Sequence, residues 1–302
     1  MAGTPLNIQQ PIMNHLDQIT AYIINYNSAH VIETCLKNLG DVASIIIVDN
    51  ASTDDSLALA ERINPNVKII RNSDNQGYGV AANQALAEVK TPYALAVNPD
   101  AEIDAEAITK LVQGMIDYPN AIVTAPYLHN PDRGLVLTGM GPHERIQGPL
   151  PVVPEGPFTT WFITGAVWLC RMSAWRDVGG YDENIFLYCE DYDLCRRATS
   201  KGYTLVYIPE SQGTHLVNQA TIPTRRIRWR KEWNMTWSEL YLAEKYEGPA
   251  KGRSEGFRKL RHHAPKALFY LLVLDQKRLL RDLPAALAAW RFLRGGKPTR
   301  GR

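Results

Sequence analysis

The chain contains 302 residues but has few cysteines and no long run of apolar residues. Its 4 cysteines are irregularly spaced and form no CxxC pair, which argues against a zinc ribbon and a disulfide framework. We therefore expect reduced thiols and a cytoplasmic protein. The longest strongly apolar stretch, 267–274, is much shorter than the roughly 20 residues of a membrane-spanning helix. The first 20 residues also lack the features of a signal peptide.

Charges of both signs are nearly equal in number but unevenly distributed. Residues 1–224 contain 13 basic and 24 acidic side chains, a net charge of −11. Residues 225–302 contain 20 basic and 7 acidic side chains, a net charge of +13. With 45% hydrophobic residues the composition is globular rather than disordered. An acidic body with a basic tail indicates contact between the tail and nucleic acid or an anionic membrane.

Short apolar segments alternate with helical patterns from residue 20 onward. Their order predicts βαβ units and therefore an α/β fold with a mainly parallel, Rossmann-like sheet flanked by helices. Residues 127–160 are rich in Gly and Pro, and we expect a long irregular segment there. The predicted strands are 20–25, 44–48, 67–71, 93–97 and 203–208, and the predicted helices are 30–39, 54–63, 79–89 and 105–117.

The composition changes near residue 224. We predict an N-terminal extension over 1–19, a main domain over 20–224 and a basic helical region over 225–302. Pro265 and Pro284 are expected to divide the last part of that region into short helices.

Three tryptophans, Trp229, Trp233 and Trp237, share one face of a predicted helix beside several arginines. This face could meet a membrane interface or pack on the main domain, and both interpretations stay open. We expect an anionic membrane surface as a partner through 225–302, and for 257–302 we favour this contact over simple solvation of the charges. No nucleic acid is expected, because no recognised nucleic-acid module accompanies the charge.

Polar residues follow each of the first four predicted strands. Because ligands bind outside the carboxyl ends of strands in open α/β sheets, these residues indicate one shared crevice. Asp49 stands directly at a strand end, where we favour contact with a ligand over a purely structural role. For 52–55, capping of the next helix is an equally good explanation.

Gly77, Gly79 and Ala82 match the dinucleotide fingerprint GxGxxG/A in spacing. Five residues separate them from the preceding apolar run, whereas the true fingerprint follows its strand directly. A nicotinamide enzyme is therefore a minor alternative.

Asp100 follows a predicted strand and stands two residues after Asn98. A carboxylate in this position could bind Mg²⁺ together with substrate phosphates. Equally, it could cap the helix that begins near Asp104. His215 follows another predicted strand and is a second candidate metal ligand.

Glu190, Asp191 and Asp193 form an acidic cluster whose self-repulsion requires compensation. Asp193 and Arg197 are spaced to pair on a helix, which explains Asp193 structurally. Glu190 and Asp191 then stand at the start of the helix, where a carboxylate could act as a general base. A solvated or dipole-stabilised helix start is the structural alternative.

Taken together, seven segments resemble the family 2 glycosyltransferases of GT-A fold, especially the bacterial rhamnosyltransferase-like members. They cover about 20–217 in the order of the family. The segments are INYN at 24–27, IVDNASTD at 47–54, 75–83, NPD at 98–100, FITGA at 162–166, VGGYDE at 178–183 and FLYCEDYDLC at 186–195.

This resemblance implies a GT-A catalytic domain over 20–224 with a C-terminal helical extension. It further implies that Asp100 and His215 bind Mg²⁺ or Mn²⁺, although Asn98 stands where the fuller DxD motif has Asp. Asp191 matches the general base of the family, with Glu190 beside it. The implied nucleotide-sugar-binding residues are Tyr26, Asn27, Asp49, Asn50, Asn75, Gly77, Asn83, Asn98 and Gly165.

The expected function is therefore an inverting glycosyltransferase at the inner face of the cell membrane. It would move a rhamnose-like sugar from a nucleotide-diphosphate donor to a hydroxyl of a glycan or lipid-linked acceptor. Two alternatives remain: a nucleotidyltransferase on a similar fold, although its glycine- and Lys/Arg-rich loop is absent, and a non-catalytic nucleotide-binding module.

Overall fold

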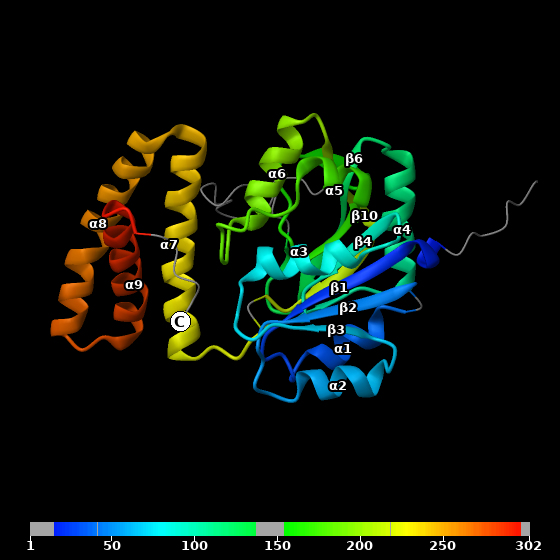
Figure 1. Cartoon of the computed structure of the whole chain (residues 1–302), viewed down its shortest axis with the longest axis horizontal. Coiled ribbons are helices and arrows are strands. Elements are labelled where there is room, and N and C mark those ends of the chain that lie inside the picture. The colour runs from blue at the N-terminus through cyan, green and yellow to red at the C-terminus, as the bar shows by residue number, and fades with distance from the viewer. Residues whose placement is uncertain (1–14, 41, 137–153, 218, 297–302) are drawn as a thin grey trace, which may run out of the picture.

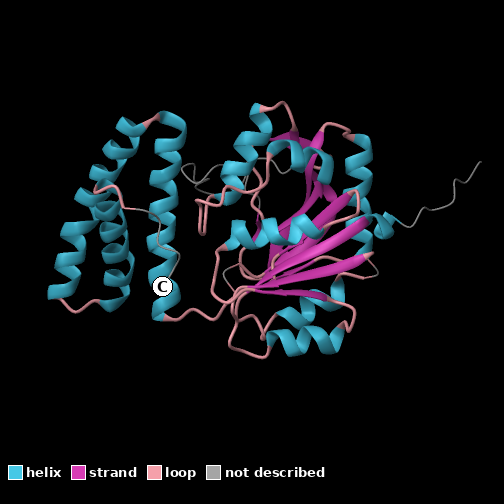
Figure 2. Ribbon diagram, in the orientation of Figure 1, coloured by secondary structure: helices cyan, strands magenta, loops and turns pink. Residues whose placement is uncertain are grey.

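A computed structural model describes residues 15–40, 42–136, 154–217 and 219–296. The described chain forms an α/β domain followed by three long helices (Figure 1, Figure 2). A short 3-10 helix, His15–Gln18, precedes the first strand. The strands are β1 (Ile19–Asn25), β2 (Ser44–Asp49), β3 (Lys68–Arg71), β4 (Tyr93–Val97), β5 (Ala101–Glu102), β6 (Ala121–Asn130), β7 (Gly134–Val136), β8 (Phe158–Thr160), β9 (Val167–Arg171) and β10 (Thr204–His215).

The strands form one sheet in the order β3-β2-β1-β4-β9-β6-β10-β5, with β7 beside β6 and β8 beside β10. Strands β3, β2, β1 and β4 are parallel, which confirms the prediction of βαβ units. The helices of this domain are α1 (Ile32–Asn38), α2 (Ser56–Ile63), α3 (Tyr78–Glu88), α4 (Ala105–Asp117), α5 (Met172–Val178) and α6 (Glu190–Ser200).

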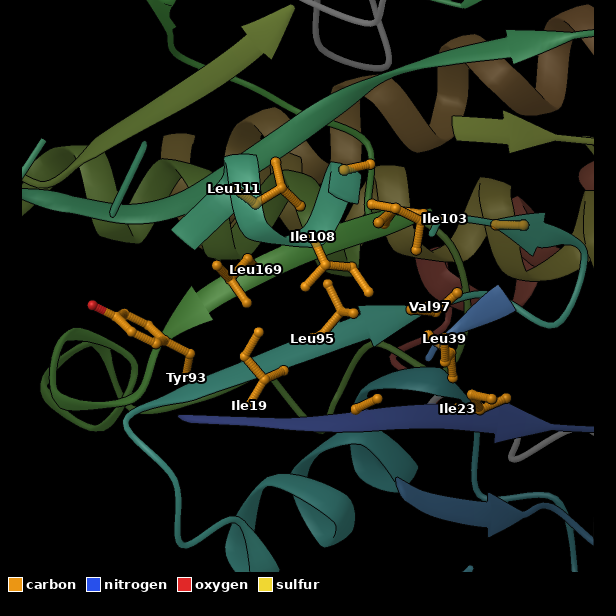
Figure 3. Packing of buried hydrophobic residues seen from close by; sticks show 14 of the residues in the cluster. Ile19, Ile23, Leu39, Tyr93, Leu95, Val97, Ile103, Ile108, Leu111 and Leu169 are labelled. Atoms are coloured by element: carbon orange, nitrogen blue, oxygen red, sulfur yellow. The ribbon is translucent and has the colours of Figure 1, made fainter. Parts of the chain in front are cut away.

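Helices cover both faces of the sheet, which is why its central strands are apolar almost throughout. On one face, Ile108 of α4 belongs to the same buried cluster as Ile19 and Leu95 of the sheet (Figure 3). On the other face, Trp175 of α5 is buried in a cluster with Trp168 of β9. These two layers fix the strand ends that carry the candidate site.

The prediction of an irregular segment over 127–160 is wrong at both ends of that range. Residues 127–130 continue β6, and β7 and β8 lie within the segment. Strand β8 pairs with β10, far away in the sequence, so long-range pairing outweighs the local turn preference. Residues 137–153 lie outside the described residues. Strand β9, antiparallel between β4 and β6, also interrupts the parallel order.

The basic region forms α7 (Arg225–Glu247), α8 (Pro249–Leu272) and α9 (Gln276–Leu293), and α7 lies between the sheet and the other two (Figure 1). The prediction that Pro265 and Pro284 divide short helices is wrong, because each lies inside a helix. Packing among the three helices compensates for the backbone hydrogen bond that each proline cannot donate. None of the helices in the described part of the chain combines the length and the apolar character that a membrane-spanning segment needs.

Trp237, the third member of the tryptophan face, is buried with an exposed fraction of 4%. Its ring lies 5.5 Å from that of Phe292 in α9, in an edge-on arrangement. Trp237 therefore packs within the helical region itself, which neither of the two interpretations anticipated.

Candidate active site

A buried hydrogen-bond network centred on Asn25 joins the carboxyl ends of β1 and β2. Asn25 Nδ2 donates to Asp49 Oδ1 and to Ser56 Oγ, each at 2.8 Å. Ser28 Oγ donates to Asn25 Oδ1. The network fixes the loops after both strands, at the edge where open α/β sheets bind ligands.

Asp49 is itself buried, with an exposed fraction of 4%. Its Oδ1 also accepts from Ser52 Oγ at 2.5 Å, and its Oδ2 accepts from the Ser52 N–H at 3.0 Å. Both oxygens are thus engaged within the protein, which favours the structural role for Asp49. Contact between Asp49 and a ribose stays a prediction.

Tyr26 and Asn27 lie on the loop after β1. Asn27 adopts a left-handed φ of 53°, and its Oδ1 accepts from the Thr53 N–H at 2.7 Å. Arg230 Nη1 of α7 donates to the Tyr26 hydroxyl at 3.2 Å, and Thr221 Oγ1 donates to the Tyr26 carbonyl at 2.8 Å. The helical region therefore contributes to this site, which sequence reasoning missed because Arg230 stands in a basic run.

Asn50, Asn75 and Gly77 meet at the start of α3. Asn50 Nδ2 donates to the Gly77 carbonyl at 3.0 Å, and the Gly77 N–H donates to Asn75 Oδ1 at 2.9 Å. A Cβ on Gly77 would lie 2.1 Å from the Phe186 carbonyl oxygen. This close approach places the loop that leads to Glu190 against the amino end of α3.

Asn83 makes hydrogen bonds to the loop before α6. Its Nδ2 donates to the Tyr181 carbonyl at 3.0 Å, and its Oδ1 accepts from the Tyr181 N–H at 2.9 Å. These bonds hold the loop in place, so a positioning role explains Asn83 at least as well as donor contact.

Asp100 and His215 are brought together by β5, which pairs antiparallel with the end of β10. Asp100 Oδ1 lies 3.4 Å from His215 Nε2, and Asp100 Oδ2 accepts from the Gln219 and Ala220 N–H groups at 3.0 Å. Burial alone would raise the pKa of Asp100, but the His215 ring and the Gln219 N–H outweigh it and lower that pKa. Asp104, not Asp100, caps α4, so the capping alternative for Asp100 is wrong.

Asp100 and His215 offer a carboxylate oxygen and an imidazole nitrogen, which are suitable ligands for a divalent cation. Within the described residues, the buried Asp100 Oδ1 and His215 Nδ1 have no hydrogen-bond partner. No described group of three or more His, Cys, Asp or Glu residues could hold a metal ion. Two protein ligands are nevertheless sufficient for Mg²⁺ when substrate phosphates and water complete the shell.

Asp191 lies in the first turn of α6 and is half-buried. Its Oδ1 accepts from the Tyr192 N–H at 2.8 Å, and its Oδ2 accepts from the Gly165 N–H at 3.2 Å. The Asn98 N–H donates to the Ala166 carbonyl at 2.9 Å. The segment containing Gly165 therefore links Asp191 to the strand end that carries Asp100.

Glu190 and Asp191 are adjacent carboxyl groups, and the charge of Asp191 changes the pKa of Glu190. Burial, followed by the charge of Asp191, raises the pKa of Glu190 to about 8. Burial also raises the pKa of Asp191, although hydrogen bonds from Tyr192 and Gly165 oppose this shift. Just before the pair, Tyr188 and Cys189 both have a left-handed φ of 68°. Such backbone strain concentrates at functional sites, and here it lies at the start of α6, where Cys189 is the N-cap.

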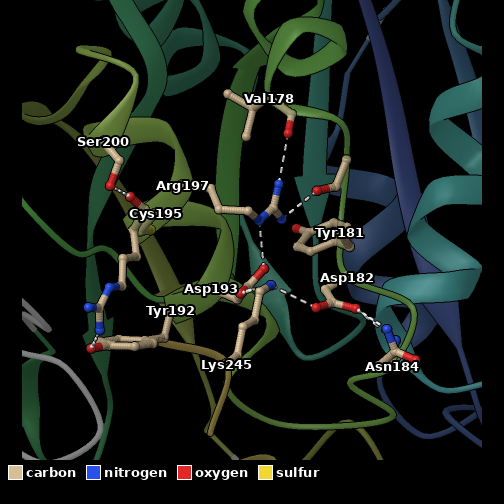
Figure 4. Close-up of polar contacts among 12 residues, drawn as sticks. Val178, Tyr181, Asp182, Asn184, Tyr192, Asp193, Cys195, Arg197, Ser200 and Lys245 are labelled. Atoms are coloured by element: carbon tan, nitrogen blue, oxygen red, sulfur yellow. Dashed lines mark hydrogen bonds and ion pairs between the residues drawn. The ribbon is translucent and has the colours of Figure 1, made fainter. Parts of the chain in front are cut away.

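Asp193 is fully buried and pairs with Arg197 at 2.7 Å, as the helical spacing predicts. Its other oxygen contacts Lys245 Nζ of α7 at 2.5 Å, and the same Nζ contacts Asp182 at 2.7 Å (Figure 4). Lys245 thus attaches α7 to α6 and to the preceding loop, a contact that no local pattern could indicate.

Two family models match this chain. The one described as glycosyl transferase family 2 matches residues 20–179, and the one described as glycosyl transferase family group 2 matches residues 148–287. An N-acetylglucosaminyl-diphospho-decaprenol L-rhamnosyltransferase from Mycobacterium tuberculosis is 25% identical over 285 residues, covering 82% of this chain and 92% of the relative. The low-salt glycan biosynthesis hexosyltransferase of Haloferax volcanii is 27% identical over 194 residues, covering 61% of this chain and 62% of the relative.

Solved structures show the same fold at low identity. A Pyrobaculum calidifontis mannosyltransferase in complex with GDP-Man and Mn²⁺ has a TM-score of 0.54 and 15% identity, covering 94% of this chain and 77% of that chain. Residues 1–349 of S. aureus TarS in complex with UDP give a TM-score of 0.52 and 14% identity, and the match covers 94% of this chain and 95% of that chain. The expected GT-A fold is confirmed. With a family model that matches more than half of its length, the chain belongs to the family 2 glycosyltransferases.

Proposed function

We propose that this glycosyltransferase transfers a rhamnose-like sugar from a nucleotide-diphosphate donor to a hydroxyl of a lipid-linked or glycan acceptor, with inversion at the anomeric carbon. The observation that carries the proposal is the position of Asp191, hydrogen-bonded to Gly165 and linked through residue 166 to the strand end of Asp100. The name of the Mycobacterium tuberculosis relative supports the sugar and the lipid-linked acceptor class.

Asp191 is the proposed general base. An acceptor hydroxyl has a pKa far above 7 and needs a base to remove its proton as it attacks. The raised pKa of Asp191 makes this carboxylate a better proton acceptor than an exposed one. A single displacement needs no covalent intermediate, unlike the two steps of a retaining glycosidase.

Glu190 holds its proton through neutral pH, which keeps the pair at one negative charge. Tyr26, Asn27 and Asn50 are proposed to shape the nucleotide side of the crevice. Asp100 and His215 would hold Mg²⁺ or Mn²⁺, which when bound balances the charge of the leaving diphosphate.

A donor panel tests the proposal. The full chain is incubated with UDP-, GDP- and dTDP-sugars, Mn²⁺ and a prenyl-diphosphate-linked N-acetylglucosamine, and the glycosylated product is measured by mass spectrometry. Product from a dTDP-linked deoxyhexose is expected, with inverted configuration by NMR. In a parallel incubation with nucleoside triphosphates and a sugar 1-phosphate, release of pyrophosphate and formation of a nucleotide-sugar would support the nucleotidyltransferase instead. Tight nucleotide binding without turnover would support the non-catalytic module.

A further inference from the structure

Exposed apolar side chains concentrate on the hairpin formed by α8 and α9. Of the 12 large hydrophobic residues that are exposed in the described chain, 9 lie between 257 and 290. Scattered exposed hydrophobic residues need no explanation, but a contiguous set indicates an interaction surface. The nine are Phe257, Leu268, Phe269, Leu271, Leu272, Val273, Leu274, Leu287 and Trp290.

A groove of about 400 Å³ runs between the two helices. Leu260, Leu268 and Leu271 line it from α8, and Leu279, Leu283 and Trp290 line it from α9. The lining positions repeat at intervals of three and four residues on each helix, so each contributes one continuous apolar stripe.

The turn that joins the helices is the most exposed apolar part. Leu272 and Leu274 have exposed fractions of 74% and 80%, and Val273 between them has 52%. Leu274 adopts a left-handed φ of 57°, an unfavourable conformation for this residue type. The turn thus presents three adjacent apolar side chains to the surroundings.

The charge around this apolar surface is positive. Lys277 and Arg278 follow the turn directly, and both are exposed. The two acidic residues of the hairpin turn and α9 are already engaged. Asp275 accepts from the Arg278 N–H as the helix N-cap and also pairs with the Arg278 side chain at 3.6 Å, and the buried Asp282 pairs with His263 and Arg281. The remaining charge repels a second copy of the same face and attracts anionic headgroups.

We propose that the α8–α9 turn and groove form a membrane-docking surface, with the turn inserted among lipid acyl chains and the basic residues at anionic headgroups. Arg294 lies 4.8 Å from the centre of the Trp290 ring, and tryptophan beside arginine is typical of the membrane interface. This surface is narrower than the expected 225–302, and it excludes the buried Trp237. The proposal is independent of the chemistry at Asp191.

Vesicle flotation tests the proposal with the full chain. Vesicles contain equal parts of phosphatidylglycerol and phosphatidylcholine, or phosphatidylcholine alone. We expect binding to the anionic vesicles that weakens as salt increases, and at least tenfold weaker binding for the double variant L272E/L274E. Ile116→Glu in α4 is the matched control, because Ile116 is also exposed, at 51%, but lies on the main domain. Equal loss in the control, or no loss in the double variant, would overturn the proposal.

A dye attached at the turn gives a second measurement. All 4 cysteines are free and buried, so an environment-sensitive thiol dye should react selectively with Leu274→Cys or, as control, Ile116→Cys. A blue shift on adding anionic vesicles is expected at residue 274 only. If the shift instead appears without lipid and grows with protein concentration, a second copy covers the face and the membrane proposal is wrong.

Discussion

Asp100 Oδ1 lies 3.4 Å from His215 Nε2, although the two residues are far apart in the chain. The contact depends on β5, a strand of only two residues, whose Ala101 pairs with His215 at the end of β10. The Leu216 N–H then donates to the Asp100 carbonyl at 3.0 Å. Two backbone contacts therefore hold a carboxylate and an imidazole side by side in a buried setting.

Asp100→Asn should weaken Mn²⁺ binding in the presence of a nucleoside diphosphate. The amide lacks the negative charge that a hard cation requires, and removing even an indirect metal partner typically costs about 10–100-fold in affinity. Isothermal titration of Mn²⁺ into the chain with UDP or dTDP measures the effect. Asp104→Asn is the control, because Asp104 only caps α4 and asparagine also caps helices. Equal affinities in wild type and Asp100→Asn would remove Asp100 from the metal site.

Asp191→Asn should lower kcat by about 10²–10⁴-fold, the usual contribution of a general base. The donor dissociation constant should change little, because a general base acts on the hydroxyl of the acceptor and not on the donor. Steady-state kinetics and donor titration separate the two effects. A normal kcat for Asp191→Asn would exclude it as the base.

Glu190→Gln should retain kcat within about tenfold at neutral pH, well short of a general-base loss. Burial and the charge of Asp191 raise the pKa of Glu190 to about 8, so the protonated form that glutamine imitates dominates at pH 7. Above pH 8 the wild type gains a second negative charge and its kcat should change, whereas the variant should show no such change. A pH profile in which both proteins behave alike near pH 8 would contradict this account.

Lys245→Met should destabilise the folded chain by about 1–3 kcal/mol, because the buried Asp193 loses one of its charged partners and keeps only Arg197. Burial would raise the pKa of Asp182, but its hydrogen bonds, including the one from Lys245, outweigh burial and lower that pKa to about 2. Lys245 therefore stabilises the charged form of Asp182. That stabilisation is complete above the unfolded pKa near 4 and is lost as pH falls towards 2. The difference between variant and wild type should therefore shrink over this range.

Urea unfolding at pH 7 and near pH 3 measures the change in the free energy of unfolding. Lys251→Met is the control, because Lys251 of α8 forms partly exposed ion pairs with Glu247 at the end of α7 and with Glu255 in α8, and neither reaches the main domain. Such pairs contribute about 0–1 kcal/mol. If both lysines contribute equally, the bridge from α7 to α6 has no special structural importance.

The sequence predicts the parallel strands and the pairing of Asp193 with Arg197 because both follow from local spacing. It does not predict β9, which pairs antiparallel with strands far away along the chain. Lys245 and Arg230 reach Asp193 and Tyr26 only through the packing of α7 on the main domain. Those contacts have no periodic or compositional signal, so the charge of the helical region indicated a surface and not a site.

Gly77→Ala should be much more destabilising than Gly202→Ala. Both glycines have a positive φ, 85° and 87°, but Gly77 combines it with a ψ of 175°, a backbone conformation that is essentially restricted to glycine. At Gly202 an added Cβ would meet no atom within 4 Å, so only the backbone strain of about 1–2 kcal/mol is expected. At Gly77 the Cβ would lie 2.1 Å from the Phe186 carbonyl oxygen, so the backbone leading to Glu190 must move. We therefore expect weaker nucleotide binding for Gly77→Ala as well. Urea unfolding and nucleotide titration of both variants measure these effects, and equal losses of stability would show that the contact with Phe186 yields at little cost.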